Sequence, residues 1–155
     1  MVLCGMYMKY KKLLGGILLA CLTTTPALAS EYSATFFATS AHPISSGEYN
    51  SKHNFVGIEY IENGVGYSIS TFKNSYYKQS IMYSQTAYID NNQDYKVFLM
   101  AGAVSGYEDT GAICLVKAGS ICGTIGAGIV WQYHELQPRV TIFGEAVVFS
   151  LAYAW

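Results

Sequence analysis

The stretch Ala146–Trp155 (AVVFSLAYAW) alternates between two kinds of side chain. Its odd-numbered positions are large and apolar: Val147, Phe149, Leu151, Tyr153 and Trp155. Its even-numbered positions are mostly small: Ala146, Val148, Ser150, Ala152 and Ala154. Because successive side chains of a β-strand point to opposite faces, this stretch predicts a strand with one bulky face and one small face.

Two further stretches repeat this alternation, at residues 65–73 and 125–133. Val65, Tyr67 and Ile69 alternate with Gly66, Ser68 and Ser70, and the second stretch sets Ile125, Ala127, Ile129, Trp131 and Tyr133 against Gly126, Gly128, Val130 and Gln132. A soluble barrel keeps its large apolar residues inside, whereas a transmembrane barrel turns them toward lipid. Here the small faces carry no charge and suit a narrow interior, which predicts a transmembrane barrel. A soluble, exported ligand-binding barrel is the alternative.

The chain is rich in Tyr and Gly and shows no helical period, so the predicted class is all-β. We expect an eight-stranded antiparallel up-and-down β-barrel, with strands at about 31–40, 54–61, 65–73, 79–88, 95–105, 125–133, 138–144 and 146–155. Gln137-Pro138 is expected to interrupt the ladder before the seventh strand, because proline lacks a backbone donor. If the first strand runs outward, the long connections 41–53 and 106–124 lie on the outer side, as is typical of outer-membrane barrels.

The first 29 residues are interpreted as a secretory signal, with residues 30–155 as a single barrel domain. Lysines precede the short apolar run Leu13–Leu22, and Ala27-Leu28-Ala29 provides small residues for cleavage. A retained anchor is one alternative, although the run is shorter than the roughly 20 residues that a spanning helix needs. A lipoprotein is another, because Leu18-Leu19-Ala20-Cys21 loosely matches a lipidation box.

Charge and cysteine content limit the possible functions of the exported part. Without residues 1–29, six basic and ten acidic residues remain, a net charge of −4 that argues against nucleic-acid binding. Cys114 and Cys122 remain, eight residues apart, and predict a disulfide in an oxidising compartment, with two free thiols as the alternative. No metal site or cofactor is expected. Glu59 and Arg139 are charged residues within predicted strands, and inward pairing of the two would keep charge away from lipid.

The segment Ser70-Thr71-Phe72-Lys73-Asn74-Ser75-Tyr76-Tyr77-Lys78-Gln79-Ser80 resembles the outer-membrane lipid A palmitoyltransferase family. That family carries a Phe-Lys-Asp-Ser-aromatic segment at the outer end of a strand, followed by a Lys and another strand. The resemblance covers about a dozen residues, and the eight-strand plan extends it loosely over the rest of the exported part.

The resemblance implies an acyl-transfer site in which Ser75 corresponds to the family's Ser and a histidine of the first outer loop takes part. The candidates are His42 and, alternatively, His53. Asn74 stands where the family has Asp, and an amide does not stabilise an imidazolium as an anion does. The amphipathic N-terminal helix of that family is also missing from the predicted elements. The alternative is that Asn74 and Ser75 are ordinary turn residues and both histidines are solvated loop residues. His134 falls on the opposite side and is a poor partner for Ser75.

Three functional hypotheses follow for a protein of the bacterial outer membrane. The first is a small outer-membrane barrel whose outer loops serve adhesion, host interaction or envelope integrity. The second is an acyltransferase-like enzyme that acts on lipopolysaccharide or phospholipid through Ser75, Asn74 and His42. The third is the soluble ligand-binding barrel. Membrane lipid is the expected partner of the first two, and a monomer is the expected state.

Overall fold

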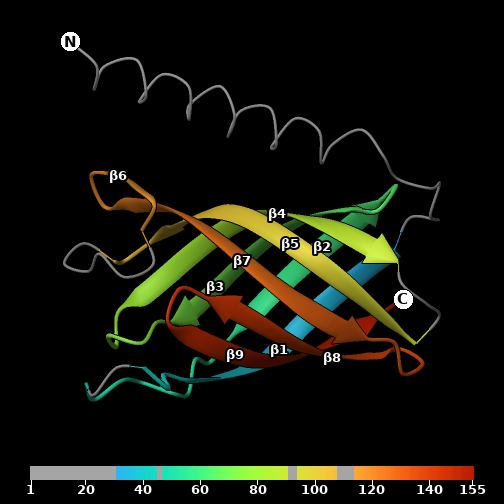
Figure 1. Cartoon of the computed structure of the whole chain (residues 1–155), viewed down its shortest axis with the longest axis horizontal. Helices are drawn as coiled ribbons and strands as arrows, with labels where there is room; N and C mark the ends of the chain where they lie inside the picture. The colour runs from blue at the N-terminus through green and yellow to red at the C-terminus, as the bar shows by residue number, and fades with distance from the viewer. Residues whose placement is uncertain (1–30, 45–46, 91–93, 108–113) are drawn as a thin grey trace, which may run out of the picture.

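The computed structural model describes residues 31–44, 47–90, 94–107 and 114–155 (Figure 1). The predicted signal at 1–29, including Cys21, lies outside these ranges. Among the described residues, no helix is long and apolar enough to cross a membrane. The strands are β1 (Glu31–Ala41), β2 (Val56–Glu62), β3 (Val65–Lys73), β4 (Gln79–Asp90), β5 (Tyr95–Ser105), β6 (Val116–Ala118), β7 (Ile121–Trp131), β8 (Leu136–Phe143) and β9 (Ala146–Ala154).

The strands form one closed antiparallel sheet. Their order is β5-β4-β3-β2-β1-β9-β8-β7, and pairing of β5 with β7 closes the ring at eight strands. The remaining strand, β6, pairs with β7 alone, so it lies outside the ring and forms a short hairpin with the start of β7. The prediction of an all-β, eight-stranded antiparallel barrel is therefore confirmed.

The two ends of the barrel differ. The loop end, at the left of Figure 1, carries the connections after β1, β3, β5 and β8, and the turn end carries the connections after β2, β4 and β7 and the C-terminus. Several predicted strand boundaries differ from the observed ones, and two of the differences matter for the fold. β7 begins at Ile121 rather than 125, so part of the predicted loop 106–124 is the β6–β7 hairpin. β8 begins at Leu136 rather than 138, so Pro138 lies inside the strand and pairs with Leu151 of β9. The pairing of β8 with β7 begins only after Pro138, at Arg139.

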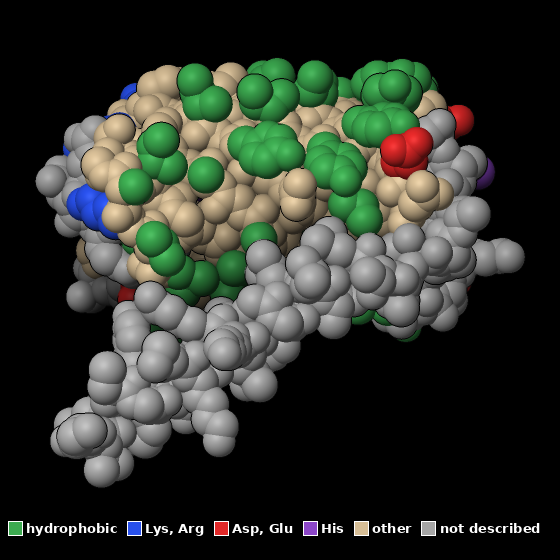
Figure 2. Space-filling model, turned by 90° about the horizontal axis from the view of Figure 1, so that it is seen from above, with side chains coloured by type: hydrophobic (Ala, Val, Ile, Leu, Met, Phe, Trp, Pro, Cys, Tyr) green, Lys and Arg blue, Asp and Glu red, His purple; other side chains and the backbone are tan. Residues whose placement is uncertain are grey.

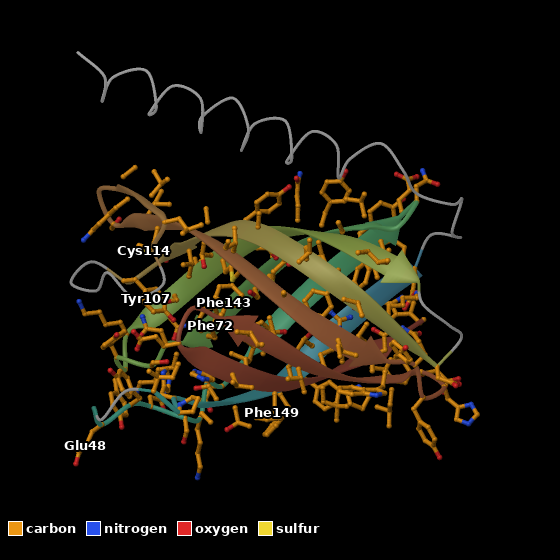
Figure 3. All side chains as sticks on the ribbon, in the orientation of Figure 1. Glu48, Phe72, Tyr107, Cys114, Phe143 and Phe149 are labelled. Atoms are coloured by element: carbon orange, nitrogen blue, oxygen red, sulfur yellow. A yellow bond between two sulfur atoms is a disulfide. The ribbon has the colours of Figure 1, made fainter. Side chains whose placement is uncertain are left out.

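The two faces of the barrel wall follow the predicted alternation. Phe149 and Tyr153 are 45% and 46% exposed, whereas Ala152 between them is fully buried. Figure 3 shows Phe149 pointing away from the barrel and Phe72 and Phe143 lying within it. In Figure 2 hydrophobic side chains spread over the middle of the visible surface, and the charged ones lie toward its ends. The outside of the barrel is therefore apolar. Its bore is lined by small side chains such as Ala152 and Ser84 together with several large ones, including Phe72, Met82 and Tyr88.

β1 departs from this alternation at one point. Its pairing with β9 runs Thr35 to Ala152 and then Phe37 to Leu151, so Phe36 is an extra residue in a β-bulge. Phe36 and Phe37 both point outward, 53% and 52% exposed. After the bulge, even-numbered rather than odd-numbered side chains of β1 face the bore. Ser40 therefore points into the bore.

Candidate functional site

A cavity of about 180 Å³ occupies the bore from the loop end downward. Its walls are largely apolar, with Phe55, Phe72, Met82, Met100, Val104 and Phe143 among the lining side chains. Phe72 of β3, Tyr107 just after β5 and Phe143 of β8 are labelled in Figure 3 and gather toward the loop end. These side chains line the bore without filling it, so space for a small apolar group remains.

A polar network, here called the floor network, closes the cavity toward the turn end. Arg139 Nη1 lies 2.7 Å from Glu59 Oε2, and Tyr88 donates a 2.8 Å hydrogen bond to Glu59 Oε1. Arg139 also donates to Ser33 Oγ at 3.1 Å and to Gln137 Oε1 at 2.7 Å. The predicted inward pairing of Glu59 with Arg139 is therefore confirmed. A Cβ at Gly66 would overlap the Glu59 carboxylate, so this position has to be glycine for the network to form.

Ser75 and His42 come together at the loop end. Ser75 follows β3, His42 follows β1, and His42 Nε2 lies 3.1 Å from Ser75 Oγ. Both residues line the cavity. A serine hydroxyl within reach of an imidazole nitrogen is the first requirement of nucleophilic catalysis. We call these two residues the Ser75–His42 pair.

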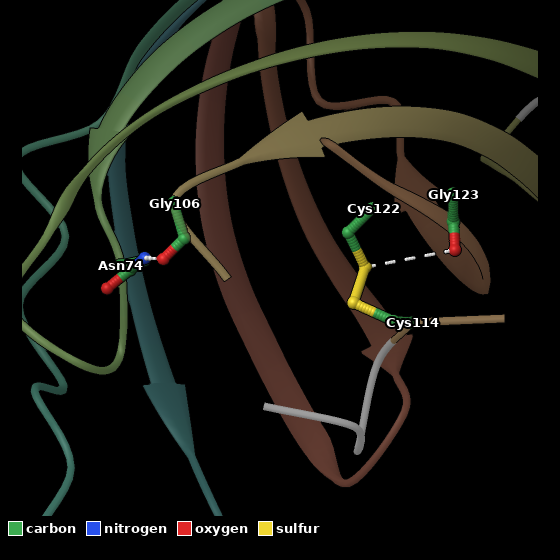
Figure 4. Close-up of a disulfide and its surroundings, with 5 residues drawn as sticks. All are labelled: Asn74, Gly106, Cys114, Cys122 and Gly123. Carbon is green, nitrogen blue, oxygen red and sulfur yellow. Dashed lines mark hydrogen bonds between the residues drawn. A yellow bond between two sulfur atoms is a disulfide. The ribbon is translucent and has the colours of Figure 1, made fainter. Parts of the chain in front are cut away.

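Asn74 is fully buried, and its side chain bonds away from the Ser75–His42 pair. Its Nδ2 donates to Ser80 Oγ at 3.0 Å and to Gly106 O at 2.8 Å, the latter drawn in Figure 4. Its Oδ1 accepts from the backbone N–H groups of Tyr76 and Lys78. Both N–H donors and both oxygen lone pairs of the Asn74 side-chain amide are thus used, and they hold the β3–β4 turn in place. The side chain of Asn74, predicted to act together with Ser75 and His42, therefore makes no hydrogen bond to either of them in this structure.

His53, the alternative candidate, is 6% exposed and bonds a different serine. Its Nε2 lies 2.7 Å from Ser40 Oγ, and its Nδ1 lies 2.8 Å from the carbonyl oxygen of Lys73. Ser40 Oγ is also 3.4 Å from His42 Nε2, so the Ser40–His53 pair and the Ser75–His42 pair adjoin. The reading of the sequence missed Ser40. The available signal was the doublet Phe36-Phe37, which breaks the alternation just before it.

Aromatic side chains enclose the histidine of the Ser75–His42 pair. The ring of Tyr49 stacks on His42 with 4.3 Å between centroids, and Tyr76 contacts both Tyr49 and Tyr107 edge-on. Burial lowers the pKa of His42, the nearby His53 lowers it further, and Glu145 opposes this. Burial also raises the pKa of Tyr107 to about 12. His42 therefore favours its neutral, proton-accepting form.

The predicted disulfide between Cys114 and Cys122 is present, with the two Cα atoms 5.1 Å apart (Figure 4). It joins the segment before β6 to the start of β7, and Cys122 packs under the loop end with Val104 and Tyr107. His134 lies in the β7–β8 connection at the turn end, away from Ser75, as predicted. Across the described ranges, the His, Cys, Asp and Glu side chains form no group of three that could hold a metal ion.

Comparisons with known proteins relate the chain to others by its fold. No family model matches it, and no curated protein sequence matches it. A designed transmembrane β-barrel superposes with a TM-score of 0.59 at 13% identity, over 85% of this chain and 100% of its own. The outer-membrane protein Ail of Yersinia pestis, solved in a phospholipid bilayer nanodisc, aligns over 81% of this chain and 98% of its own, at 13% identity and a TM-score of 0.42. The first likeness shows the closed barrel fold, and the second is too weak to support an argument.

Proposed function

We propose that this chain is a small outer-membrane β-barrel of the bacterial envelope. The support is the exterior of the barrel wall, where large apolar side chains from several strands are more than half exposed, among them Ile58, Ile69, Ile81, Ile125 and Ile142. Water would make so broad an apolar surface unfavourable, whereas lipid does not. Aromatic rings gather at the turn end, where Tyr32 stacks on Trp155 with centroids 6.2 Å apart, as in the interfacial girdles of such barrels.

The barrel acts on an acyl ester of a membrane lipid, either lipopolysaccharide or phospholipid, at its loop end. The observation that carries this proposal is the 3.1 Å approach of His42 Nε2 to Ser75 Oγ beside the cavity. In this reading His42 takes the hydroxyl proton of Ser75, and the oxygen attacks the ester carbonyl.

The cavity suits a hydrocarbon chain better than a polar substrate. Its volume of about 180 Å³ lies below the roughly 300 Å³ at which ordinary drug-sized ligand pockets begin, so it takes one slender group. Apolar walls above and the floor network below would accept a chain end-on and stop it within the bore. A lipid seated in the outer leaflet would then present its ester near the Ser75–His42 pair.

The test is mass spectrometry of lipopolysaccharide and phospholipids from cells that carry the wild-type chain, no chain, Ser75→Ala or His42→Ala. We expect a gain or loss of one acyl group with the wild-type chain and little change with either variant. His134→Ala, at the turn end, is the matched control and retains the effect. Identical lipids in all strains would contradict the enzymatic proposal while leaving the membrane location untouched.

A non-catalytic surface role is the second candidate. The observation that favours it is the β6–β7 hairpin, where Leu115 and Val116, outside the barrel ring, are 63% and 71% exposed, and Ile121, at the start of β7, is 52% exposed. The Cys114–Cys122 disulfide holds this apolar surface in place. Binding of cells to a host surface that survives Ser75→Ala but is lost in Val116→Asp would support this role. Purification of the folded barrel in buffer without detergent would instead favour the soluble alternative.

A further inference from the structure

Of the two serine–histidine pairs at the loop end, the Ser40–His53 pair has the shorter contact between hydroxyl and imidazole, 2.7 Å against 3.1 Å. We infer that Ser40 is a second nucleophile of this site, in addition to Ser75, with His53 as its general base and the Lys73 carbonyl as the group that orients His53. The inference rests on the proposed lipid-ester chemistry and names a residue beyond the Ser75–His42 pair. Its basis is a continuous set of contacts: Ser40 Oγ to His53 Nε2 at 2.7 Å, and His53 Nδ1 to Lys73 O at 2.8 Å.

The Lys73 carbonyl fixes the state of the His53 ring. A carbonyl oxygen only accepts, so Nδ1 of His53 carries the hydrogen in this contact. In the neutral ring Nε2 then has a free lone pair, and the Ser40 hydroxyl donates to it. This is the nucleophile–base–orienter arrangement of serine hydrolases, with a backbone carbonyl in the place of the carboxylate.

The backbone of His53 is held as firmly as its ring. His53 N donates to Ala38 O at 3.3 Å, and its carbonyl accepts from Lys73 N at 2.7 Å. Asn50 Nδ2 adds a 3.3 Å hydrogen bond to the same Lys73 carbonyl. The base is thus preorganised before any substrate arrives, which is where most catalytic benefit of such geometry arises.

The β1 bulge brings Ser40 to the base. With regular alternation from Ser33, which faces the bore, positions 37 and 39 would face inward and Ser40 would face lipid. The extra residue Phe36 reverses that parity, and Ser40 then lines the cavity beside His42 and His53. Bulges commonly re-aim a side chain next to an active site.

The reaction requires no co-reactant beyond the lipids themselves. Ser40 Oγ attacks the ester carbonyl carbon while its proton passes to His53 Nε2. The bond from that carbon to the lipid alkoxide breaks, the alkoxide takes the proton from His53, and an acyl ester on Ser40 remains. The hydroxyl of a second lipid, or water, then attacks this ester and gives its proton to His53. Ser40 leaves with that proton, and the acyl group has been transferred or hydrolysed.

The test uses the folded full-length protein in detergent and a long-chain alkyl fluorophosphonate, whose P–F bond is replaced by a bond to a reactive serine oxygen. Trypsin separates the two candidates, because Ser40 lies before the cleavage site at Lys52 and Ser75 lies in the peptide 74–78. Fragment mass spectrometry then locates the adduct. We expect adducts on Ser75 and on Ser40, with at least a tenfold loss of the Ser40 adduct in Ser40→Ala and in His53→Asn, which keeps a donor toward Lys73 but has no base nitrogen.

Ser120→Ala is the matched control, because Ser120 is an exposed serine of the β6–β7 turn and does not line the cavity. It is expected to label on Ser40 as the wild type does. The wild-type mapping stands even if a variant fails to fold. An adduct confined to Ser75 would overturn the assignment of Ser40 and leave the proposed function standing, and labelling of neither serine would overturn both.

Discussion

Asn74 Nδ2 donates a 2.8 Å hydrogen bond to the carbonyl oxygen of Gly106, which ties the β3–β4 turn to the end of β5. Gly106 has a φ of +84°, and a Cβ there would lie 2.7 Å from Ser80 Oγ, another partner of Asn74. The asparagine side chain therefore ties the backbone of the β3–β4 turn to the backbone after β5 and to the Ser80 side chain, and a carboxylate has no amide hydrogens to make the last two contacts.

Asn74→Asp is expected to destabilise the barrel rather than to create a catalytic carboxylate. One aspartate oxygen would face the Gly106 carbonyl without a hydrogen between them, at a cost of about 1–3 kcal/mol for a buried unsatisfied contact. Denaturant midpoints of the refolded protein measure this. Asn63→Asp, in the exposed β2–β3 turn, makes the same chemical change and is expected to leave the midpoint nearly unchanged. An Asn74→Asp protein as stable as the wild type and more active would contradict this reading.

Loss of Arg139 is expected to have the largest effect on stability. Arg139→Ala leaves the Glu59 carboxylate buried without its cation, which typically costs about 3–5 kcal/mol. Arg139→Met combined with Glu59→Gln removes both charges and is expected to recover much of this loss. Lys96→Met breaks the more exposed 3.9 Å contact with Glu31 and should cost at most about 1 kcal/mol. Equal midpoints for Arg139→Ala and Lys96→Met would argue against the floor network as described.

Removal of the disulfide is expected to loosen the β6–β7 hairpin more than the barrel. β6 has only three residues and depends on the disulfide beside it. The double variant Cys114→Ser with Cys122→Ser removes this cross-link, which for a short loop contributes about 2 kcal/mol to the free energy of unfolding. Amide hydrogen exchange should then accelerate at Leu115, whose N–H donates to Gly123 O, while amides of β2 and β3 keep their protection. Uniform acceleration over all strands would show that the disulfide supports the whole barrel instead.

The ring of His42 is expected to titrate below its ordinary pKa of 6.5 in the folded barrel. Because burial and His53 lower the pKa of the folded state, the unfolded chain binds a proton first as the pH falls. The contribution of His42 to the free energy of unfolding is therefore undiminished above pH 6.5 and declines below it. Any activity that uses neutral His42 persists to lower pH than it would with an ordinary histidine.

Glu145→Gln is the matched variant for this titration. Glu145 raises the His42 pKa, so its neutralisation moves the midpoint to still lower pH. NMR shifts of the His42 ring, assigned with His42→Gln, measure both midpoints. A wild-type midpoint above 6.5, or a Glu145→Gln midpoint above that of the wild type, would contradict the described environment.

The architecture could be predicted from the sequence because one physical rule governs it. Side chains of a barrel strand face either the bore or the outside, so alternation in 65–73 and 146–155 sets the orientation of every residue there. The same rule placed Glu59 in the bore and made Arg139 its natural partner. The disulfide followed from two cysteines eight residues apart.

The organisation of the site could be predicted only in part. Ser75 and His42 do meet, but the resemblance that suggested them could not show that Asn74 bonds elsewhere. Ser40 stayed hidden because strict alternation assigns it to the outer face, and a bulge is a departure from that rule. The start of β8 at Leu136, ahead of Pro138, was missed because the donor that proline lacks affects pairing with β7 and leaves pairing with β9 intact.

The extra residue in β1 has a consequence for how such a site arises. One inserted codon at position 36 exchanges the inner and outer contents of the strand from there to its end, while the earlier half keeps its place. Without the extra residue, the same side chains would present Ser40 to the outside of the barrel. The length of β1, as well as the identity of its residues, therefore decides which side chains reach the bore.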